Sequence, residues 1–228
     1  MSKLTKLIIL ILLSLSVYFI YNYTNNTTIK ILTLGDSLSL GKDSLGAKNY
    51  GYMNIYRDYL ISKNKKVELI DKYLKEDLSI KELLQEVKTN PSLKRDLLES
   101  HQLFINVGYN DLIYKISLEE DLKQSSFNKI NKDISREFNN LIKEIRKYYK
   151  NNIVVIGYFE SNKDDYYINK GIRNLNNIYK NNTEIYYIDT YNILKNRKKY
   201  FSNPDSYYPN INGYQCIANK IINETLAK

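Results

Sequence analysis

The sequence has little cysteine and little histidine, with one residue of each among 228. The single cysteine, Cys216, excludes an intrachain disulfide and also excludes metal sites built from paired cysteines. The single histidine, His101, is the only imidazole that the chain offers as a general base. Any reaction that needs a histidine of this chain therefore depends on where His101 lies.

Positive charge is in excess but is not concentrated in one segment. Lys and Arg number 34 against 25 Asp and Glu, which gives a formal net charge of +9. Such an excess favours anionic partners such as nucleic acid, acidic lipid or a polyanionic polymer. In KKVELIDKYLKEDLSIKEL, however, basic and acidic residues are interleaved, and Lys, Asn, Ile and Tyr are abundant throughout. This pattern favours an AT-rich gene as the origin of the charge, and no nucleic-acid motif is present.

An apolar run at the N-terminus is typical of a membrane segment. Lys3 and Lys6 precede LIILILLSLSVYFIYNY, and no small-x-small cleavage site follows it. We predict an uncleaved signal anchor and polar tether over residues 1–28, with the two lysines inside. The protein is then a single-pass cell-membrane protein with its domain outside, or a secreted one if the segment is cleaved. A buried N-terminal helix is the alternative.

Residues 29–228 are predicted to form one α/β domain. The 43% hydrophobic and 26% charged fractions are ordinary for a globular protein. The predicted strands cover residues 29–34, 66–71, 102–107, 152–159 and 183–189. The predicted helices cover residues 52–63, 80–88, 127–149, 168–179 and about 212–226. This alternation predicts a three-layer α/β/α sandwich around a central parallel sheet of about five strands, with reactive residues beyond the strands' carboxyl ends.

The stretch LTLGDSLSLG places Ser37 directly after the first predicted strand. Gly35 permits a sharp turn there, and a helix starting nearby would direct free N–H groups toward an oxyanion. A Gly-Asp-Ser turn that only caps a helix is equally common. A phosphate-binding loop is excluded, because five residues rather than four separate the two glycines and an aspartate follows the lysine.

Two further segments carry polar residues, one directly after a predicted strand and one in a loop before the last predicted helix. In FINVGYNDL an apolar strand ends in Gly-Tyr-Asn-Asp, where the Asn110 amide could donate to an oxyanion or the Asn-Asp pair could merely cap the next helix. In NPDSYYPNINGY a Pro- and Asn-rich loop carries Asp205 into the last predicted helix. Each segment alone is a modest signal.

Together and in this order, the three segments resemble the blocks of the SGNH/GDSL hydrolase family. GDSLS resembles the nucleophile block, GYND the Gly-x-Asn-Asp block, and DSYYPNINGY the closing Asp-x-x-His-Pro-Asn-x-x-Gly-Tyr block. The resemblance extends from about Ile29 to the C-terminus. It implies the flavodoxin-like SGNH hydrolase fold and hydrolysis of carboxylic esters in small molecules, lipids or polysaccharides, without a metal or cofactor.

The resemblance also implies roles for individual residues. Ser37 corresponds to the nucleophile, Asp205 to the acid member of the triad, and Ser37, Gly108 and Asn110 to the oxyanion hole. The family's second block contributes a glycine, but the corresponding region here, YLKEDLSIKELL, has none. Where the family has its catalytic histidine, this chain has Tyr208.

The sequence offers no obvious substitute for that histidine. His101 stands at the start of the third predicted strand, so seven strand steps of about 3.3 Å place it roughly 23 Å from the carboxyl end. Tyr208 is the catalytic candidate by position, but a free phenol is mostly protonated at neutral pH and accepts protons poorly. Two hypotheses follow. The first is a membrane-anchored serine esterase or acyl-transfer enzyme that uses Ser37 with an altered proton relay or with a histidine borrowed from a partner chain. The second is an inactive relative that binds an acylated carbohydrate, lipid or cell-wall polymer.

Overall fold

Five parallel strands form the centre of the structure, a computed structural model that describes residues 3–48, 50–160, 166–203 and 206–226. The strands are β1 (Ile29–Gly35), β2 (Val67–Ile70), β3 (Gln102–Asn106), β4 (Ile153–Ile156) and β5 (Ile185–Ile188). They lie in the order β2-β1-β3-β4-β5, and every neighbouring pair is parallel. The predicted parallel sheet of about five strands is confirmed.

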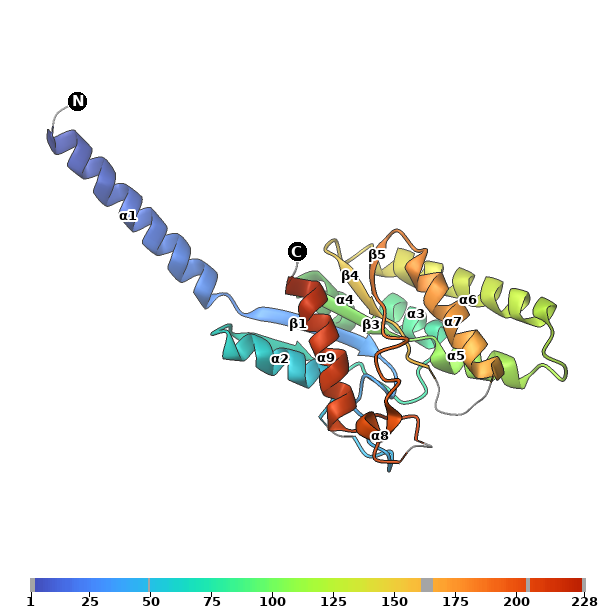
Figure 1. Ribbon diagram of the computed structural model, residues 1–228. Coiled ribbons are helices and arrows are strands. Elements are labelled where there is room, and N and C mark those ends of the chain that lie inside the picture. The colour runs from blue at the N-terminus through green and yellow to red at the C-terminus, as the bar shows by residue number, and fades with distance from the viewer. Residues whose placement is uncertain (1–2, 49, 161–165, 204–205, 227–228) are drawn as a thin grey trace.

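Helices cover both faces of this sheet. In chain order the described helices are α1 (Lys3–Asn26), α2 (Tyr52–Ser62), α3 (Ile80–Thr89), α4 (Pro91–Glu99), α5 (Tyr109–Ser117), α6 (Gln124–Ile145), α7 (Tyr166–Lys180), α8 (Arg197–Tyr200) and α9 (Ile211–Leu226), and α1 alone among them extends away from the sheet. Helices α2 and α9 pack together on one face, and α3, α6 and α7 pack on the other (Figure 1). The three-layer α/β/α sandwich is therefore confirmed.

The strand order creates one topological switch point, between β1 and β3. From β1 the chain crosses to β2 on one side, and from β3 it crosses to β4 on the other. Crossovers that leave in opposite directions open a crevice beyond the carboxyl ends of the two strands, where open α/β sheets bind their ligands. Residues that follow β1 and β3 are thereby brought to the same crevice.

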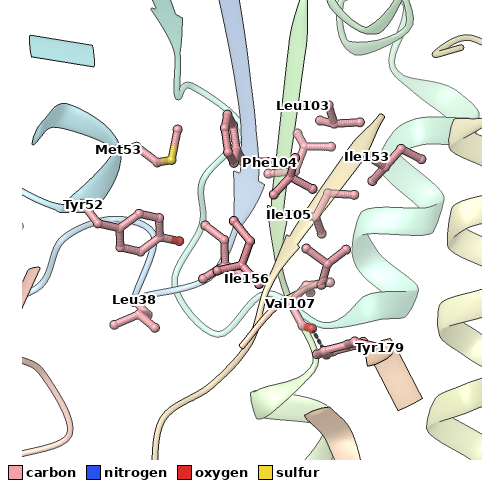
Figure 2. Packing of buried hydrophobic residues seen from close by; sticks show 14 of the residues in the cluster. Leu38, Tyr52, Met53, Leu103, Phe104, Ile105, Val107, Ile153, Ile156 and Tyr179 are labelled. Atoms are coloured by element: carbon pink, nitrogen blue, oxygen red, sulfur yellow. Dashed lines mark hydrogen bonds between the residues drawn. The ribbon is translucent and has the colours of Figure 1, made fainter. Parts of the chain in front are cut away.

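The middle strands are buried on both faces. In β3, Leu103, Phe104 and Ile105 are at most 1% exposed, as expected for a central parallel strand covered by helices. Figure 2 shows these side chains packed with those of β4, and a hydrogen bond from the Tyr179 hydroxyl to the Val107 carbonyl oxygen just past β3. This bond ties helix α7 to the carboxyl end of the central strand.

Three short helices, α4, α5 and α8, were not among the predicted elements. Residues 80–99 form α3 and α4, and Asn90 ends the first while its side chain accepts the Ser92 and Leu93 N–H groups that begin the second. Helix α5 begins directly after Gly108. All three helices are too short to show a clear apolar period, so the sequence pattern did not reveal them.

The N-terminal helix α1 includes most of the residues predicted as a tether, since it ends at Asn26. Figure 1 shows it extending away from the sheet, and its side chains from Ile8 to Tyr18 are exposed. Within the described residues, no helix has the length and apolar character required to cross a membrane.

His101 lies at the amino edge of the sheet, as predicted. It is exposed between α4 and β3, and its Nδ1 accepts the Lys30 N–H at 3.1 Å. Its backbone N–H donates to the Lys30 carbonyl oxygen at 2.9 Å. The only imidazole in the chain thus extends the pairing of β1 with β3 at the edge opposite the crevice.

Replacement of Gly108 by alanine should destabilise the domain more than replacement of Gly46. Both glycines have positive φ, 120° and 79°, so both variants carry backbone strain of about 1–2 kcal/mol. A Cβ at Gly108 would also lie 2.5 Å from the Tyr179 hydroxyl, whereas nothing lies within 4 Å at Gly46. We expect a loss of about 2–4 kcal/mol for Gly108→Ala and about 1 kcal/mol for Gly46→Ala, from urea unfolding. Equal losses would contradict the packing account.

Candidate active site

Ser37 stands on a tight turn at the carboxyl end of β1. Gly35 is required there, because a Cβ would lie 2.3 Å from Ser39 Oγ and 2.7 Å from the Asn106 carbonyl oxygen. The Asp36 N–H donates to that same carbonyl oxygen at 3.1 Å, which fixes the turn to the end of β3. A run of turns rather than a helix follows Ser37, and the next helix, α2, begins at Tyr52.

A cavity of about 690 Å³ opens beyond this turn, at the β1–β3 switch point. It is lined by Asp36, Ser37, Leu38, Asp77, Tyr109, Asn110, Ile113, Tyr114, Ser117, Tyr158, Phe159, Ile168, Ile172, Tyr207 and Tyr208. Ser37, Asn110 and Tyr208, which the sequence analysis predicted as site residues, therefore share one cavity. Within the described part of the chain, the Ser37 hydroxyl has no hydrogen-bond partner, so its lone pairs are not engaged.

Asn110 and Asp111 fix the start of α5 against the loop that follows β2. The Asn110 amide donates to the Leu78 carbonyl oxygen at 3.3 Å, and Asp111 Oδ2 accepts the Ile80 N–H at 2.9 Å. The latter contact occupies a free N–H at the start of α3. Asn110 is thus held beside the cavity, while the Asp111 carboxylate serves the packing of two helices.

Gly108 is not among the residues that line the cavity. Its φ of 120° and its contact with Tyr179 give it a backbone and packing role at the start of α5. The oxyanion roles of Gly108, Asn110 and the Ser37 N–H remain predictions.

The closing segment, residues 206–214 of the described chain, brings Tyr207 and Tyr208 to the cavity. The Tyr208 N–H donates to Ser206 Oγ at 3.0 Å, and Arg197 donates to the Ser206 carbonyl oxygen at 3.1 Å. These bonds hold the backbone just before Tyr208 against α8. Asp205, the predicted acid of the triad, lies outside the described residues.

Asp36 is a buried carboxyl that the sequence analysis did not single out. Its side-chain oxygens accept the Leu38 N–H at 3.1 Å and the Tyr158 hydroxyl at 2.6 Å, and the residue is 3% exposed. Burial raises the pKa of Asp36 to about 7, and the nearby acids Asp111 and Asp77 act in the same direction. The carboxyl directly beside the candidate nucleophile therefore titrates near neutral pH.

Asp77 occupies the loop where the resemblance calls for a glycine. It has a φ of 53°, the left-handed conformation that Asp tolerates better than most residues, and it lines the cavity. The loop is tied to the nucleophile turn because the Lys75 N–H donates to the Gly35 carbonyl oxygen at 3.1 Å. A search for Asp or Asn as well as Gly in this region of the sequence would have found the position.

Tyrosine rings form the wall of the cavity nearest the closing segment. The ring centroid of Tyr109 lies 5.5 Å from that of Tyr158 and 6.2 Å from that of Tyr207. At the other end, Ile113 from α5 and Ile168 and Ile172 from α7 give an apolar lining. The cavity thus joins a polar end at Ser37 to an apolar end between two helices.

Comparison with known proteins matches residues 31–221 to the family of GDSL-like lipases and acylhydrolases. This chain belongs to that family. The match includes the nucleophile turn, the segment after β3 and the closing segment. No curated protein matches the chain.

Solved structures share the fold at low sequence identity. A lipase from a goat rumen metagenome has a TM-score of 0.72 at 21% identity, with 86% of this chain and 96% of that chain covered. An acetylxylan esterase from Geobacillus stearothermophilus has a TM-score of 0.65 at 15% identity, covering 86% and 93%. A lipolytic GDSL-family protein from Veillonella parvula has a TM-score of 0.62 at 16% identity, covering 86% and 97%. The α/β SGNH hydrolase fold predicted from the sequence is therefore confirmed.

Asp36→Asn should change how stability depends on pH. A carboxyl whose pKa is raised on folding, here from 3.8 to about 7, contributes stability that is present below pH 4 and is lost as the pH rises toward 7. An amide at this position can still accept the Leu38 N–H and does not titrate. Between pH 4 and pH 8 the wild type should therefore lose a few kcal/mol relative to the variant in urea unfolding. Parallel curves for the two proteins would contradict the assignment.

Proposed function

We propose that this chain is a serine ester hydrolase that uses Ser37 as its nucleophile. The observation that supports this most strongly is the presence of Ser37, Asn110 and Tyr208 around one cavity at the sheet's switch point. Attack by Ser37 Oγ on an ester carbonyl would form a tetrahedral oxyanion, and the amide of Asn110, which lines the same cavity, would donate to it. Expulsion of the alcohol and attack by water would complete the reaction.

The proposed substrates are esters such as acetylated carbohydrates or other acylated polymers of the cell envelope. The acetylxylan esterase among the similar folds supports a carbohydrate ester. The tyrosine-rich wall offers flat apolar faces that suit sugar rings, and the apolar end of the cavity suits an acyl group. Asp205 keeps its predicted role as the acid of the site.

The altered base is the main departure from a conventional triad. The acetylxylan esterase has been solved as catalytic mutants that replace a serine or a histidine by alanine. Here the histidine position of the closing block holds Tyr208, and His101 lies at the opposite edge of the sheet. We therefore propose slow hydrolysis in which Tyr208 takes part in the proton relay.

A non-catalytic relative that binds acylated carbohydrate, lipid or wall polymer is the second candidate. The observation that favours it is the same tyrosine, because a neutral phenol is a weak proton acceptor. The cavity would then hold its ligand without cleaving it.

Ser37→Ala should abolish hydrolysis of a p-nitrophenyl ester by the full chain. The expected result is a fall to the uncatalysed rate, because the acyl-enzyme can no longer form. Ser62→Ala is the control, since this exposed hydroxyl bonds only locally to the Tyr59 carbonyl oxygen, and it should leave the rate unchanged. If the wild type hydrolyses no ester but binds an acetylated oligosaccharide in calorimetry, the second candidate replaces the first.

We also propose that the N-terminal segment anchors the domain at the outer face of the cell membrane. Support comes from the sequence, in which two lysines precede a long apolar run. Full-length protein with a C-terminal tag should sediment with membranes and resist carbonate extraction, and its domain should be cleaved by protease added to intact cells. Removal of residues 1–28 should release it. A full-length chain found in the soluble cell fraction would contradict anchoring.

A further inference from the structure

Lys42 is a largely buried lysine beside Tyr208. Its side chain is 12% exposed, and its Nζ lies 2.7 Å from Glu76 Oε2 and 5.8 Å from the centroid of the Tyr208 ring. Lysine is rarely withdrawn from water unless it is paired. The ammonium group is thus held between a carboxylate and the ring that occupies the histidine position.

The backbone of Lys42 is fixed to the same closing segment. Its carbonyl oxygen accepts the Tyr214 hydroxyl at 2.6 Å, and Tyr214 is 2% exposed on α9. Gly41 precedes it with a φ of 70°, which turns the chain toward this contact. Because Tyr208 and Tyr214 lie six residues apart on the closing segment, Lys42 contacts that segment through both its backbone and its side chain.

The other charged and titratable groups near Lys42 and Tyr208 come from several described elements. They are Asp36 from the nucleophile turn, Glu76 and Asp77 from the loop after β2, Tyr109 from α5, Arg197 from α8, Tyr207 from the closing segment and Tyr214 from α9. Burial raises the pKa values of Tyr109 and Tyr214, which keeps both phenols neutral. The hydrogen bond that Lys42 donates to Glu76 raises the pKa of Lys42, so its positive charge persists at alkaline pH.

A negative charge on the Tyr208 oxygen would face several carboxyl groups and needs a cation nearby. Arg197 directs its guanidinium to the Ser206 and Glu160 carbonyl oxygens and to the Phe201 ring. Lys42 Nζ is the cation that lies over the Tyr208 ring itself. Lys42 therefore holds its positive charge next to the ring that would carry the negative charge.

We propose that Lys42 enables Tyr208 to serve as the general base by stabilising its phenolate. This proposal rests on the proposed function. The phenolate takes the proton of Ser37 Oγ–H while Oγ bonds to the acyl carbon, and the resulting phenol gives that proton to the departing alcohol oxygen as the ester C–O bond breaks. In the second half, Tyr208 takes a proton from water as the water oxygen bonds to the acyl carbon, and it returns that proton to Ser37 Oγ as the bond between Oγ and the acyl carbon breaks. Lys42 acts through Tyr208 and keeps its own proton throughout.

The test is the pH profile of kcat/KM for a p-nitrophenyl ester, measured on the full chain between pH 6 and pH 10. Lys42→Met should reduce activity at pH 7 by at least about tenfold and move the rising limb of the profile to higher pH. Lys42→Arg should largely restore the wild-type profile. Lys48→Met is the matched control, because this lysine lies on the same loop with 62% of its side chain exposed, and it should change nothing.

Glu76→Gln should shift the pH profile of kcat/KM in the direction opposite to the shift expected for Lys42→Met. It removes the carboxylate that offsets the Lys42 charge while leaving a side chain that is 60% exposed in the wild type, so folding should be unaffected. The rising limb should then move to lower pH. A folding defect would lower activity at every pH and would not produce opposite shifts in the two variants.

Three outcomes decide whether Lys42 has this role and whether the chain is a serine hydrolase. Opposite shifts in Lys42→Met and Glu76→Gln, with activity lost in Tyr208→Phe, support the role of Lys42. Serine-dependent turnover that survives Tyr208→Phe, or a Lys42→Met profile that superimposes on the wild type, overturns that role but leaves the hydrolase intact. No serine-dependent turnover by the wild type at any pH overturns the proposed function itself.

Discussion

The contact on which the site depends is the last rung between β1 and β3, where the Asp36 N–H donates to the Asn106 carbonyl oxygen. It lies at the point where the two central strands diverge into crossovers of opposite direction. Ser37 is the next residue of the chain after Asp36, and Asn110 follows a few residues beyond the end of β3. The close approach of Gly35 to β3 leaves no room for a side chain, so this rung also fixes how sharply the nucleophile turn bends. Strand pairing therefore sets the distance between two groups that are far apart in sequence.

Around this rung, polar groups are buried in pairs rather than alone. Asn106 donates its amide to the Ile156 carbonyl oxygen at 2.8 Å, and Ser39 shares a hydrogen bond of 2.7 Å with the Tyr52 hydroxyl. Asp36 is paired with Tyr158 in the same way. Buried polar groups are tolerated when each is satisfied, and such pairs make the arrangement specific. The wall of the crevice formed by the end of the sheet is therefore held in place by paired hydrogen bonds. The other wall is made of tyrosine rings and aliphatic side chains.

Much of this arrangement could be predicted from the sequence, because it depends on local patterns. The apolar runs gave the five strands, and their alternation with amphipathic stretches gave the parallel sheet. Ser37 and Asn110 each follow a strand directly, so the rule that carboxyl ends share an edge was enough to bring them together. The same rule placed His101 at the far edge, where its Nδ1 bonds to Lys30.

The remaining contacts join residues whose separation carries no pattern. Asp36 and Tyr158 are 122 positions apart, and nothing in either segment indicates that one would accept a hydrogen bond from the other. The approach of Lys42 to Tyr208 likewise depends on how the loop after Ser37 folds back over the closing segment. Asp77 was not predicted, because a left-handed backbone at a residue other than glycine leaves no periodic pattern in the sequence. Long-range side-chain pairs of this kind can be identified only once the fold is known.

The central claim is that Ser37 becomes acylated, and peptide mass spectrometry tests it most directly. Trypsin releases Ile31–Lys42 as one peptide, which contains Ser37 and Ser39. After a brief incubation with p-nitrophenyl acetate and an acid quench, this peptide should carry one acetyl group, and fragmentation should place it on Ser37. An unmodified peptide in protein that has turned over the ester, or an acetyl group confined to Ser39 or to another peptide, would contradict the account.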